Sequence, residues 1–319
     1  MTGPERVLVY SKYAGDLDAF RRVLASQLPE VPCAFASSLE GAKPYLEDAE
    51  ILYGWGFPSD MLRAMPKLEW VQKMGAGVDD IICAWPLDRP VVLTRTDGAL
   101  IAARMAEYVV AAILDKSLRM DHARRLQQER KWSDYTVGSI RDLTIGVAGL
   151  GEIGSEIART LRILGARVIG WRRSPTDCHA VDKVYVGTAT LEDFVTQCDA
   201  LVLVLPLTSH TAGIFGSGVL AALRPNVHLV NVGRGGVIDE AALAHGLESG
   251  RIGHATLDVF EVEPLPPTHP FWTSPRVTMT PHVCGPLVPK DVVPHFVANY
   301  RAFRAGDPLR NVIDMNRQY

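Results

Sequence analysis

The fold class is decided by the stretch Thr144-Ile145-Gly146-Val147-Ala148-Gly149-Leu150-Gly151-Glu152-Ile153-Gly154. Its first five residues are β-branched or small and predict a buried strand. The glycines that follow have the spacing GxGxxG. Gly149 permits a tight turn, Gly151 lets a pyrophosphate approach the backbone, and Gly154 lets a helix pack closely on the strand. Because exposed N–H groups and the positive end of the helix would then hold phosphates, we predict a dinucleotide-binding turn.

A helix is predicted directly after this turn. It begins at Glu152 and Ile153, which we assign to the cofactor site, and Gly165 is placed to end it. Its apolar residues recur at intervals of three or four positions, at Ile153, Ile157, Leu161 and Leu164. The order of strand, turn and helix supports the dinucleotide interpretation more than the glycine spacing alone, which also occurs in plain loops.

Short β-branched runs alternate with helical patterns on both sides of the turn. After it, strands are predicted at 167–171, 183–186, 200–205, 227–232, 255–259 and 277–279. Before it, strands are predicted at 7–10, 51–53, 70–73 and 91–94, then a long helix at 102–118 and a polar, charge-mixed stretch at 119–142. A last helix is predicted at 289–303. This alternation predicts an α/β protein with doubly wound parallel sheets covered by helices on both faces.

Length and composition limit the class of protein. A chain of 319 residues is about twice as long as a typical domain, so two domains are expected. Hydrophobic residues make up 47% and charged residues 22%, which is typical of globular chains. The net charge of −3 provides no general attraction for a polyanion, so no nucleic-acid partner is expected.

Neither a membrane anchor, an export signal nor a metal centre is expected. No apolar run approaches the roughly 18 residues that a membrane span needs. The N-terminus lacks the basic start and the cleavage site of a signal peptide, which favours a cytoplasmic protein. The five cysteines have no CxxC spacing, which indicates buried free thiols and neither disulfides nor a thiolate zinc site.

The end of the strand predicted at 167–171 indicates whether the dinucleotide has a free ribose 2′-hydroxyl or a 2′-phosphate. A cofactor with a free ribose 2′-hydroxyl usually meets Asp or Glu at this point. This chain has Trp171-Arg172-Arg173-Ser174 there. Two guanidinium groups and a hydroxyl suit a 2′-phosphate, because they can form charge-assisted hydrogen bonds with it. We therefore expect NADP(H) to be preferred and NAD(H) to be possible, with a solvated basic turn as the alternative.

Three ionisable residues follow predicted strands beyond the glycine turn: Arg234, Glu263 and His282. Because ligands of open parallel sheets bind beyond the carboxyl ends of the strands, these side chains are expected to meet in one crevice. His282 would exchange a proton with a ketone oxygen, Glu263 would fix its tautomer and favour its charged form, and Arg234 would bind a carboxylate and polarise the carbonyl. Taken singly, Arg234 could form a surface ion pair, Glu263 could be an exposed carboxylate in a loop, and His282 could be a core or capping residue. Their joint placement favours the reduction of a 2-oxo acid.

Four motifs occur in an order that points to a known family: 149–154, 231–236, 257–264 and 280–282. With 70–81 and 311–319, they resemble the D-isomer-specific 2-hydroxyacid dehydrogenases, most closely the glyoxylate/hydroxypyruvate reductase subgroup. The resemblance implies two Rossmann-like domains separated by a cleft. Residues 1–98 and 286–319 would form the substrate domain, and the NAD(P)-binding domain, 99–285, would be inserted into it. The resemblance also implies a homodimer.

The resemblance assigns further residues to the site. It places the catalytic roles on Arg234, Glu263 and His282. It assigns the substrate carboxylate to the backbone amides of Ala76 and Gly77, in a loop that without the resemblance would be taken as a plain turn. Asp258 would hold the nicotinamide carboxamide. The other cofactor assignments are Leu205, Pro206, Thr211, Val232 and Gly285.

Two features bear on which substrate is accepted. Trp55, with Tyr53 and Phe57, is expected either in an aromatic wall that limits substrate size or in the hydrophobic core. After the histidine, Cys284 and Pro286 depart from the small or hydroxyl residues that many family members have there.

The activity implied by the resemblance is NADPH-dependent reduction of short 2-oxo acids, such as glyoxylate or hydroxypyruvate, to D-2-hydroxy acids. Two alternatives stay open. One is oxidation of phosphite, which uses a similar set of Arg, Glu and His, and the other is a nucleotide-sensing, corepressor-like protein that keeps the fold only for binding. A formate site is disfavoured, because such sites usually pair the histidine with glutamine where this chain has Glu263.

Overall fold

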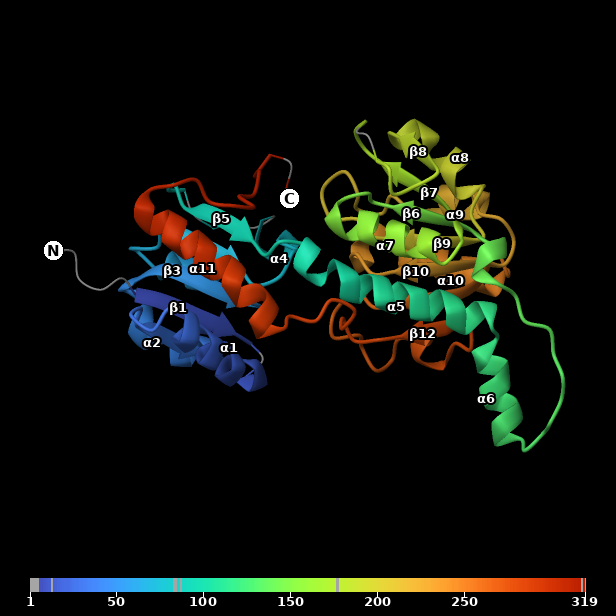
Figure 1. Cartoon of the computed structure of the whole chain (residues 1–319), viewed down its shortest axis with the longest axis horizontal. Coiled ribbons are helices and arrows are strands. Elements are labelled where there is room, and N and C mark those ends of the chain that lie inside the picture. Colours follow the sequence, from blue (N-terminus) through green and yellow to red (C-terminus); the bar gives the residue numbers. More distant parts are fainter. Residues whose placement is uncertain are drawn as a thin grey trace. The chain divides into compact units, whose positions relative to one another are not determined.

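The computed structural model describes residues 6–12, 14–82, 85–86, 88–175, 178–316 and 318 (Figure 1). The chain divides into two compact units, each built on one parallel sheet. Unit 1 comprises Met1–Leu100 and Leu287–Tyr319, and unit 2 comprises Ile101–Pro286. The chain therefore passes from one unit to the other twice, near the start of helix α5 (Ala99–Ser117) and after Pro286.

Unit 1 contains a sheet of five strands in the order β2-β1-β3-β4-β5, and each neighbouring pair is parallel. The strands are β1 (Arg6–Ser11), β2 (Cys33–Ala36), β3 (Ala49–Trp55), β4 (Trp70–Lys73) and β5 (Val92–Arg95). The helices are α1 (Ala14–Gln27), α2 (Leu39–Leu46), α3 (Ser59–Arg63), α4 (Asp79–Ile82) and α11 (Pro289–Ala305).

Both faces of the unit 1 sheet are buried, which explains why β1 is apolar at consecutive positions. Val7 and Val9 pack with α1 and α11 on one face. Leu8 and Tyr10 pack with α2 and α3 on the other. Successive side chains of a strand point to opposite faces, so a sheet covered by helices on both sides needs apolar residues at every position. Figure 1 shows α11 lying across the near face of this sheet.

Unit 2 contains a sheet of seven parallel strands in the order β12-β11-β10-β9-β6-β7-β8. The strands are β6 (Thr144–Ala148), β7 (Arg167–Arg172), β8 (Lys183–Val186), β9 (Ala200–Leu203), β10 (Val227–Asn231), β11 (Ile252–Leu257) and β12 (Val277–Met279). Besides α5, the α-helices are α6 (Met120–Gln128), α7 (Glu152–Ile163), α8 (Leu191–Val195), α9 (Ser217–Ala222) and α10 (Glu240–Glu248). Short 3-10 helices span Ile140–Asp142, Thr188–Thr190, Gly235–Val237 and Pro270–Thr273.

The unit 2 sheet is also covered on both faces. Leu201 and Leu203 of β9 pack with α8, α9 and α10 in one core cluster. Val202, between them, is fully buried on the opposite face, and α7 packs against β6 and β7. The strand order reverses beside β6, because β7 and β8 extend to one side and β9 to β12 to the other. In open parallel sheets such a reversal, at the carboxyl ends of the strands, is where ligands bind.

The predicted α/β class and the parallel sheets are confirmed, with corrections to individual elements. The stretch predicted only as polar contains helix α6, whose residues are mostly polar or charged and none of which is buried. Strand β2 was not predicted. The strand predicted at 200–205 ends at Leu203, and the strand predicted at 255–259 begins at Ile252 and ends at Leu257. The loop at 264–267 is not helical, as expected from its prolines.

The described cysteines form no disulfide. Cys198 and Cys284 are buried, as predicted, whereas Cys33 and Cys178 are only partly buried and Cys83 lies outside the described residues. Within the described residues no cluster of His, Cys, Asp or Glu is arranged to hold a metal ion. In the same part of the chain, every helix is too short or too polar to cross a membrane.

Candidate active site

The glycine turn joins β6 to α7, at the point where the strand order reverses. Gly149 has a φ of +104°, which favours glycine, and a Cβ on Gly154 would lie 1.7 Å from the carbonyl oxygen of Gly149. Its two chain neighbours aside, no atom of the described residues lies within 4 Å of the place where a Cβ of Gly151 would be, so the space beside this backbone is open. The turn thus has the strained, closely packed and open positions that a bound diphosphate requires.

Glu152 and Ile153 form the first turn of α7, and their N–H groups belong to the positive end of a helix of 12 residues. Gly165 has a φ of +94° and ends this helix, as predicted from its position. Ile157 and Leu161 are buried, which confirms the centre of the predicted apolar stripe. These features hold the helix end against β6, where the cofactor phosphates are predicted to bind.

The residues predicted around the 2′-phosphate lie at the end of β7, next to β6. Arg172 is the last residue of that strand, and Arg173 and Ser174 follow as exposed residues. Trp171 is different, because its indole ring is buried in the unit 2 core and donates a hydrogen bond to the carbonyl of Gly187 at 3.0 Å. Its own carbonyl accepts the N–H of Gly149 at 2.9 Å, so Trp171 supports the glycine turn from behind.

The other predicted cofactor residues follow the neighbouring strands. Leu205 follows β9 and is buried in the core, while Pro206 is exposed at the start of a loop. Thr211 closes this loop by donating its hydroxyl to the carbonyl of Pro206 at 2.6 Å. Val232 follows β10 and is buried, and Gly285 lies close to Met105 of α5. The contacts of these residues with a nucleotide remain predictions.

A histidine and a carboxylate form the centre of the candidate site. His282 follows β12 and Glu263 follows β11, and His282 Nδ1 lies 2.8 Å from Glu263 Oε2. Both side chains are about one third exposed, so they are open to a small molecule. The other carboxylate oxygen, Oε1, accepts the N–H of Phe260 at 3.0 Å. If Nδ1 donates to this anchored carboxylate, Nε2 is the nitrogen left to exchange a proton with a reactant.

The electrostatics keep Glu263 ionised. Burial raises the pKa of this carboxyl group, but hydrogen bonds from His282 and from the Phe260 N–H, with the charges of His282 and Arg234, outweigh burial and lower it. An ionised Glu263 can only accept hydrogen bonds, which orients the proton on His282 Nδ1 toward it. The effect of the Arg234 charge on this pKa also indicates that Arg234 belongs to the same cluster.

Arg234 follows β10 in a turn that Asn231 shapes. The Asn231 side chain accepts the N–H of Gly233 at 3.1 Å and donates to the carbonyl of Arg234 at 3.0 Å. The Arg234 guanidinium donates to the carbonyl of Gly233 at 2.8 Å and is half-buried. A Cβ on Gly235 would lie 1.9 Å from the carbonyl carbon of Phe260, so the turn packs tightly against the segment leading to Glu263.

Asp258 is fully buried directly after β11, and its carboxylate is directed at the segment that carries His282. It accepts the Thr280 hydroxyl and the N–H of Val283 at 2.9 Å on one oxygen, and the N–H of Cys284 at 3.0 Å on the other. The predicted role of Asp258 toward a nicotinamide carboxamide stays a prediction.

Unit 1 carries the residues predicted to bind substrate. Tyr53 and Phe57 are buried in its core. Of the two predicted possibilities, an aromatic wall or the hydrophobic core, the second therefore applies to these two residues. Trp55 ends β3 half-buried, and a Cβ on Gly75 would lie 2.0 Å from its ring. The backbone N–H groups of the half-buried Ala76 and Gly77 have no hydrogen-bond acceptor among the described residues. Two such donors in one turn are what an anion-binding loop requires.

The sequence of this chain is similar to those of known dehydrogenases and reductases. Residues 110–284 match the family model for the D-isomer specific 2-hydroxyacid dehydrogenase, NAD binding domain. A glyoxylate/hydroxypyruvate reductase A from Yersinia enterocolitica is 34% identical over 278 residues, which cover 86% of this chain and 88% of that protein. The protein of the same name from Serratia proteamaculans is 36% identical over 266 residues, which cover 82% of this chain and 85% of that protein.

Solved structures agree with this match over almost the whole chain. An NADPH-dependent glyoxylate/hydroxypyruvate reductase from Sinorhizobium meliloti, in complex with NADP and sulfate, has a TM-score of 0.91 at 32% identity, covering 99% of this chain and 100% of that one. A D-isomer specific 2-hydroxyacid dehydrogenase from Xanthobacter autotrophicus, in complex with NADPH and MES, has a TM-score of 0.90 at 32% identity, with the same coverage.

The fold and the residues at its strand ends define the class of nicotinamide-dependent dehydrogenases. The family model covers more than half of the 319 residues, and the curated relatives exceed 30% identity over most of their length. The chain therefore belongs to the D-isomer specific 2-hydroxyacid dehydrogenase family. This confirms the predicted family and the predicted class of enzyme.

Three polar residues of the site were not predicted from the sequence: Asn231, Thr280 and Tyr108. Asn231 and Thr280 lie at strand ends next to Arg234 and His282, so their positions carried a usable signal. Tyr108 lies in the middle of α5 and contacts Thr280 across 172 positions of the sequence. Nothing in its local pattern distinguishes it from the neighbouring helical residues.

Proposed function

We propose that the protein uses NADPH to reduce short 2-oxo acids, such as glyoxylate or hydroxypyruvate, to D-2-hydroxy acids. The observation that carries the proposal is the hydrogen bond between His282 and an ionised Glu263. This pair lies beyond the carboxyl ends of the strands of unit 2, as does the glycine turn. The names of the Yersinia, Serratia and Sinorhizobium relatives support the choice of substrates. The proposed division of roles gives nucleotide binding and the three catalytic residues to unit 2, and further substrate contacts to unit 1.

In this proposal His282 Nε2 gives a proton to the carbonyl oxygen while the carbonyl carbon is reduced. The reduced nicotinamide, when bound, supplies the hydride. Arg234 holds the substrate carboxylate and polarises the carbonyl. The role proposed for the amides of Ala76 and Gly77 is also to bind a carboxylate. The product gains one hydride at carbon and one proton at oxygen, and the neutral imidazole takes a proton from the solvent before the next turnover.

The test is turnover of the purified protein, measured as loss of the reduced-nicotinamide absorbance with a panel of short 2-oxo acids and both reduced nucleotides. We expect turnover of glyoxylate and of hydroxypyruvate, and the product of hydroxypyruvate should have the D configuration. Oxidation of phosphite without reduction of any 2-oxo acid would replace the proposal by the first alternative. Tight binding of NADPH without any turnover would replace it by the nucleotide-sensing alternative.

The preference for NADPH is proposed to rest on Arg172, Arg173 and Ser174 at the end of β7. Replacing both arginines by alanine should raise KM for NADPH about 100-fold and KM for NADH less than about threefold, because charge-assisted hydrogen bonds to the 2′-phosphate are lost. The measurement is steady-state kinetics with each nucleotide. Arg167→Ala, at the opposite end of the same strand, is the matched control and should change neither constant. An equal rise for both nucleotides would contradict the 2′-phosphate assignment.

We propose that the protein is a homodimer and that the segment around α6 contributes to the contact. Trp132 is completely exposed, and the same segment exposes Leu118, Met120 and Val137. A fully exposed tryptophan is typical of residues that become buried when a partner binds.

We expect the wild-type protein to sediment as a dimer, and Trp132→Asp to weaken the dimer by at least about 30-fold, as for a central interface residue. Trp272→Asp is the matched control, because this tryptophan is exposed elsewhere in unit 2 and should leave the dimer intact. Analytical ultracentrifugation over a range of concentrations measures both. Sedimentation of Trp132→Asp like the wild type would remove this segment from the interface.

A cytoplasmic location is part of the proposal. It is supported by the four described cysteines, which are all free thiols, because reducing compartments keep thiols in this state.

A further inference from the structure

A chain of hydroxyl groups leads from α5 to the segment that carries His282. The Tyr108 hydroxyl lies 2.6 Å from Thr280 Oγ1, and Thr280 Oγ1 donates to the Asp258 carboxylate. A threonine hydroxyl has a single hydrogen, and here that hydrogen is donated in the bond to the carboxylate. Tyr108 must therefore be the donor in the contact with Thr280. All hydrogens in this chain then point one way, toward the buried charge of Asp258, which strengthens each bond.

The chemistry of Tyr108 fits its role as a permanent donor. Burial raises the pKa of its hydroxyl to about 12, and the negative charge of Asp258 acts in the same direction, although the hydrogen bond with Thr280 partly opposes both. Tyr108 therefore keeps its proton at neutral pH. Its ring lies half-buried on α5, so loss of the hydroxyl alone leaves the packing of the ring in place.

The Asp258 carboxylate holds the backbone on both sides of His282. It binds the Thr280 hydroxyl before the histidine and the N–H groups of Val283 and Cys284 after it. The carbonyl oxygen of Asp258 also accepts the N–H of His282 at 2.8 Å. Four bonds from one residue thus fix a five-residue segment, in which the inward N–H groups leave the imidazole directed to Glu263.

The conformation of His282 shows why this segment needs to be held. Its φ is +55°, a left-handed conformation that is unfavourable for a residue with a side chain. Such a conformation persists only where the surrounding structure imposes it, and such positions cluster at active sites. The imidazole meets Glu263 Oε2 at 2.8 Å from this strained position. A release of the segment would let the histidine relax and lose that contact.

We propose that Tyr108 and Thr280 are positioning residues, whose hydroxyl chain orients the Asp258 carboxylate and thereby holds His282 in the geometry for proton transfer. The inference rests on the proposed catalytic role of His282. It assigns no contact with substrate to either residue. Its consequence is that the rate of the chemical step depends on two hydroxyl groups to which no contact with substrate or nucleotide is assigned.

The test separates the hydroxyl from the shape of the side chain. Thr280→Val, which keeps the shape, should lower kcat about tenfold with both KM values within about twofold, because a small displacement of a catalytic group mainly slows the chemical step. Thr280→Ser, which keeps the hydroxyl, should restore kcat to within about twofold of the wild type. Thr278→Val is the matched control, because Thr278 lies on β12 two residues before Thr280, and it should leave kcat unchanged.

Tyr108→Phe should lower kcat about threefold, and the double variant with Thr280→Val should be no slower than Thr280→Val alone, because groups that act in series are not additive.

Hydrogen exchange of the N–H groups of Val283 and Cys284 should speed up at least about fivefold in Thr280→Val, since their acceptor is no longer held. Unchanged kcat with unchanged exchange in Thr280→Val would overturn the proposal, as would an equal loss of kcat in Thr280→Ser. A wild-type protein that reduces no 2-oxo acid would defeat the proposed function, and the exchange rates would then decide the positioning role on their own.

Discussion

His282→Ala is expected to lower kcat for a 2-oxo acid about 1000-fold, within the range by which general acid and base groups accelerate reactions. The physical reason is that the hydride can reach the carbon only if the developing negative charge on oxygen takes up a proton. Without His282 that proton must come from water. NADPH binding should stay within about twofold of the wild type, because the glycine turn and Arg172 are untouched. Steady-state kinetics and a fluorescence titration with NADPH measure the two quantities.

Two further variants make this result specific. His282→Asn places a residue that tolerates a left-handed backbone at the position with φ +55°, so it should fold as well as the wild type and still show the low kcat. His245→Ala is the matched control, because this histidine is exposed on α10, and its kcat should be unchanged. Loss of NADPH binding in both His282 variants would show that the histidine has been assigned to the wrong function.

The proposed proton transfer depends on Glu263 as well as on His282. Its ionised carboxylate accepts from His282 Nδ1, so it determines which nitrogen of the imidazole is free. The same carboxylate is anchored by the N–H of Phe260 and is affected by the charge of Arg234. The three residues come from the ends of β10, β11 and β12, which are neighbours in the sheet. Strand order therefore places the three segments that carry these residues next to one another.

The parts of the fold that were predictable from sequence are those with strong local patterns. β4, β6, β8 and β12 begin and end where the pattern predicts, because each is a short run with clear turn residues beside it. Strand β2 was missed because it is a four-residue strand at the edge of the sheet, and two of its residues are alanines, which are depleted in strands. Helix α6 was missed because most of its residues are polar or charged, and none of them is buried in a core that would mark the helix in the sequence.

The site was predictable in its residue types but not in its hydrogen bonds. The glycine spacing and the three ionisable residues follow strands, and strand ends can be read from the sequence. The left-handed backbone of His282 and the four bonds from Asp258 cannot be read in this way, because they join residues 22 to 26 positions apart through the register of β11 and β12. The contact between Tyr108 and Thr280 depends on how α5 packs against the sheet, which no local pattern encodes.

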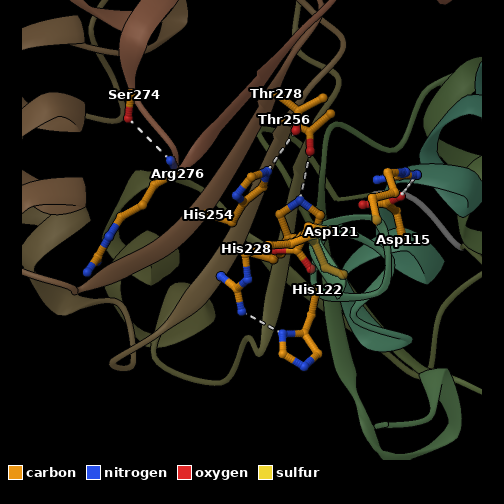
Figure 2. A network of polar contacts seen from close by, with 12 residues as sticks. Asp115, Asp121, His122, His228, His254, Thr256, Ser274, Arg276 and Thr278 are labelled. Carbon is orange, nitrogen blue, oxygen red and sulfur yellow. Dashed lines mark hydrogen bonds and ion pairs between the residues drawn. The ribbon is translucent and has the colours of Figure 1, made fainter. Parts of the chain in front are cut away.

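Acidification is expected to destabilise unit 2 through two histidines that lie away from the candidate active site. His228 of β10 and His254 of β11 are paired in register, both are buried, and their ring centroids are 5.5 Å apart. Figure 2 shows each ring hydrogen-bonded to a threonine, His228 to Thr256 and His254 to Thr278, both at 2.9 Å. These bonds require only one proton on each ring, so both histidines are accommodated as neutral groups.

Burial is the main cause of the low pKa values of this pair. Burial, with the charges of His254 and Lys116, lowers the pKa of His228 to about 3. Burial and the charge of Lys116 lower the pKa of His254 to about 4, although the carboxylates of Asp121 and Asp115 oppose this shift. Figure 2 shows both of these acidic residues beside the histidine pair. In the unfolded chain each histidine takes up a proton near pH 6.5.

The direction of the pH effect follows from these pKa values. Between about pH 6.5 and 4 the unfolded chain binds more protons than the folded one, so the free energy of unfolding falls as the pH falls. Each histidine contributes a slope of up to about 1.4 kcal/mol per pH unit. From pH 6.5 to 4.5 we expect a loss of about 3–4 kcal/mol, with the larger share from His228, because His254 is partly stabilised in its charged form by the nearby carboxylates.

His228→Gln should remove about half of this slope, because glutamine can keep a hydrogen bond to Thr256 but takes up no proton in this range. The measurement is urea unfolding at several pH values between 7 and 4.5, followed by hydrogen exchange of peptides from β10 and β11, so that unit 2 is observed separately from unit 1. His245→Gln, on the exposed surface of α10, should leave the slope unchanged. If His228→Gln loses stability with falling pH as steeply as the wild type does, the buried pair is not what makes unit 2 sensitive to acid, and the exposed carboxylates would have to account for it.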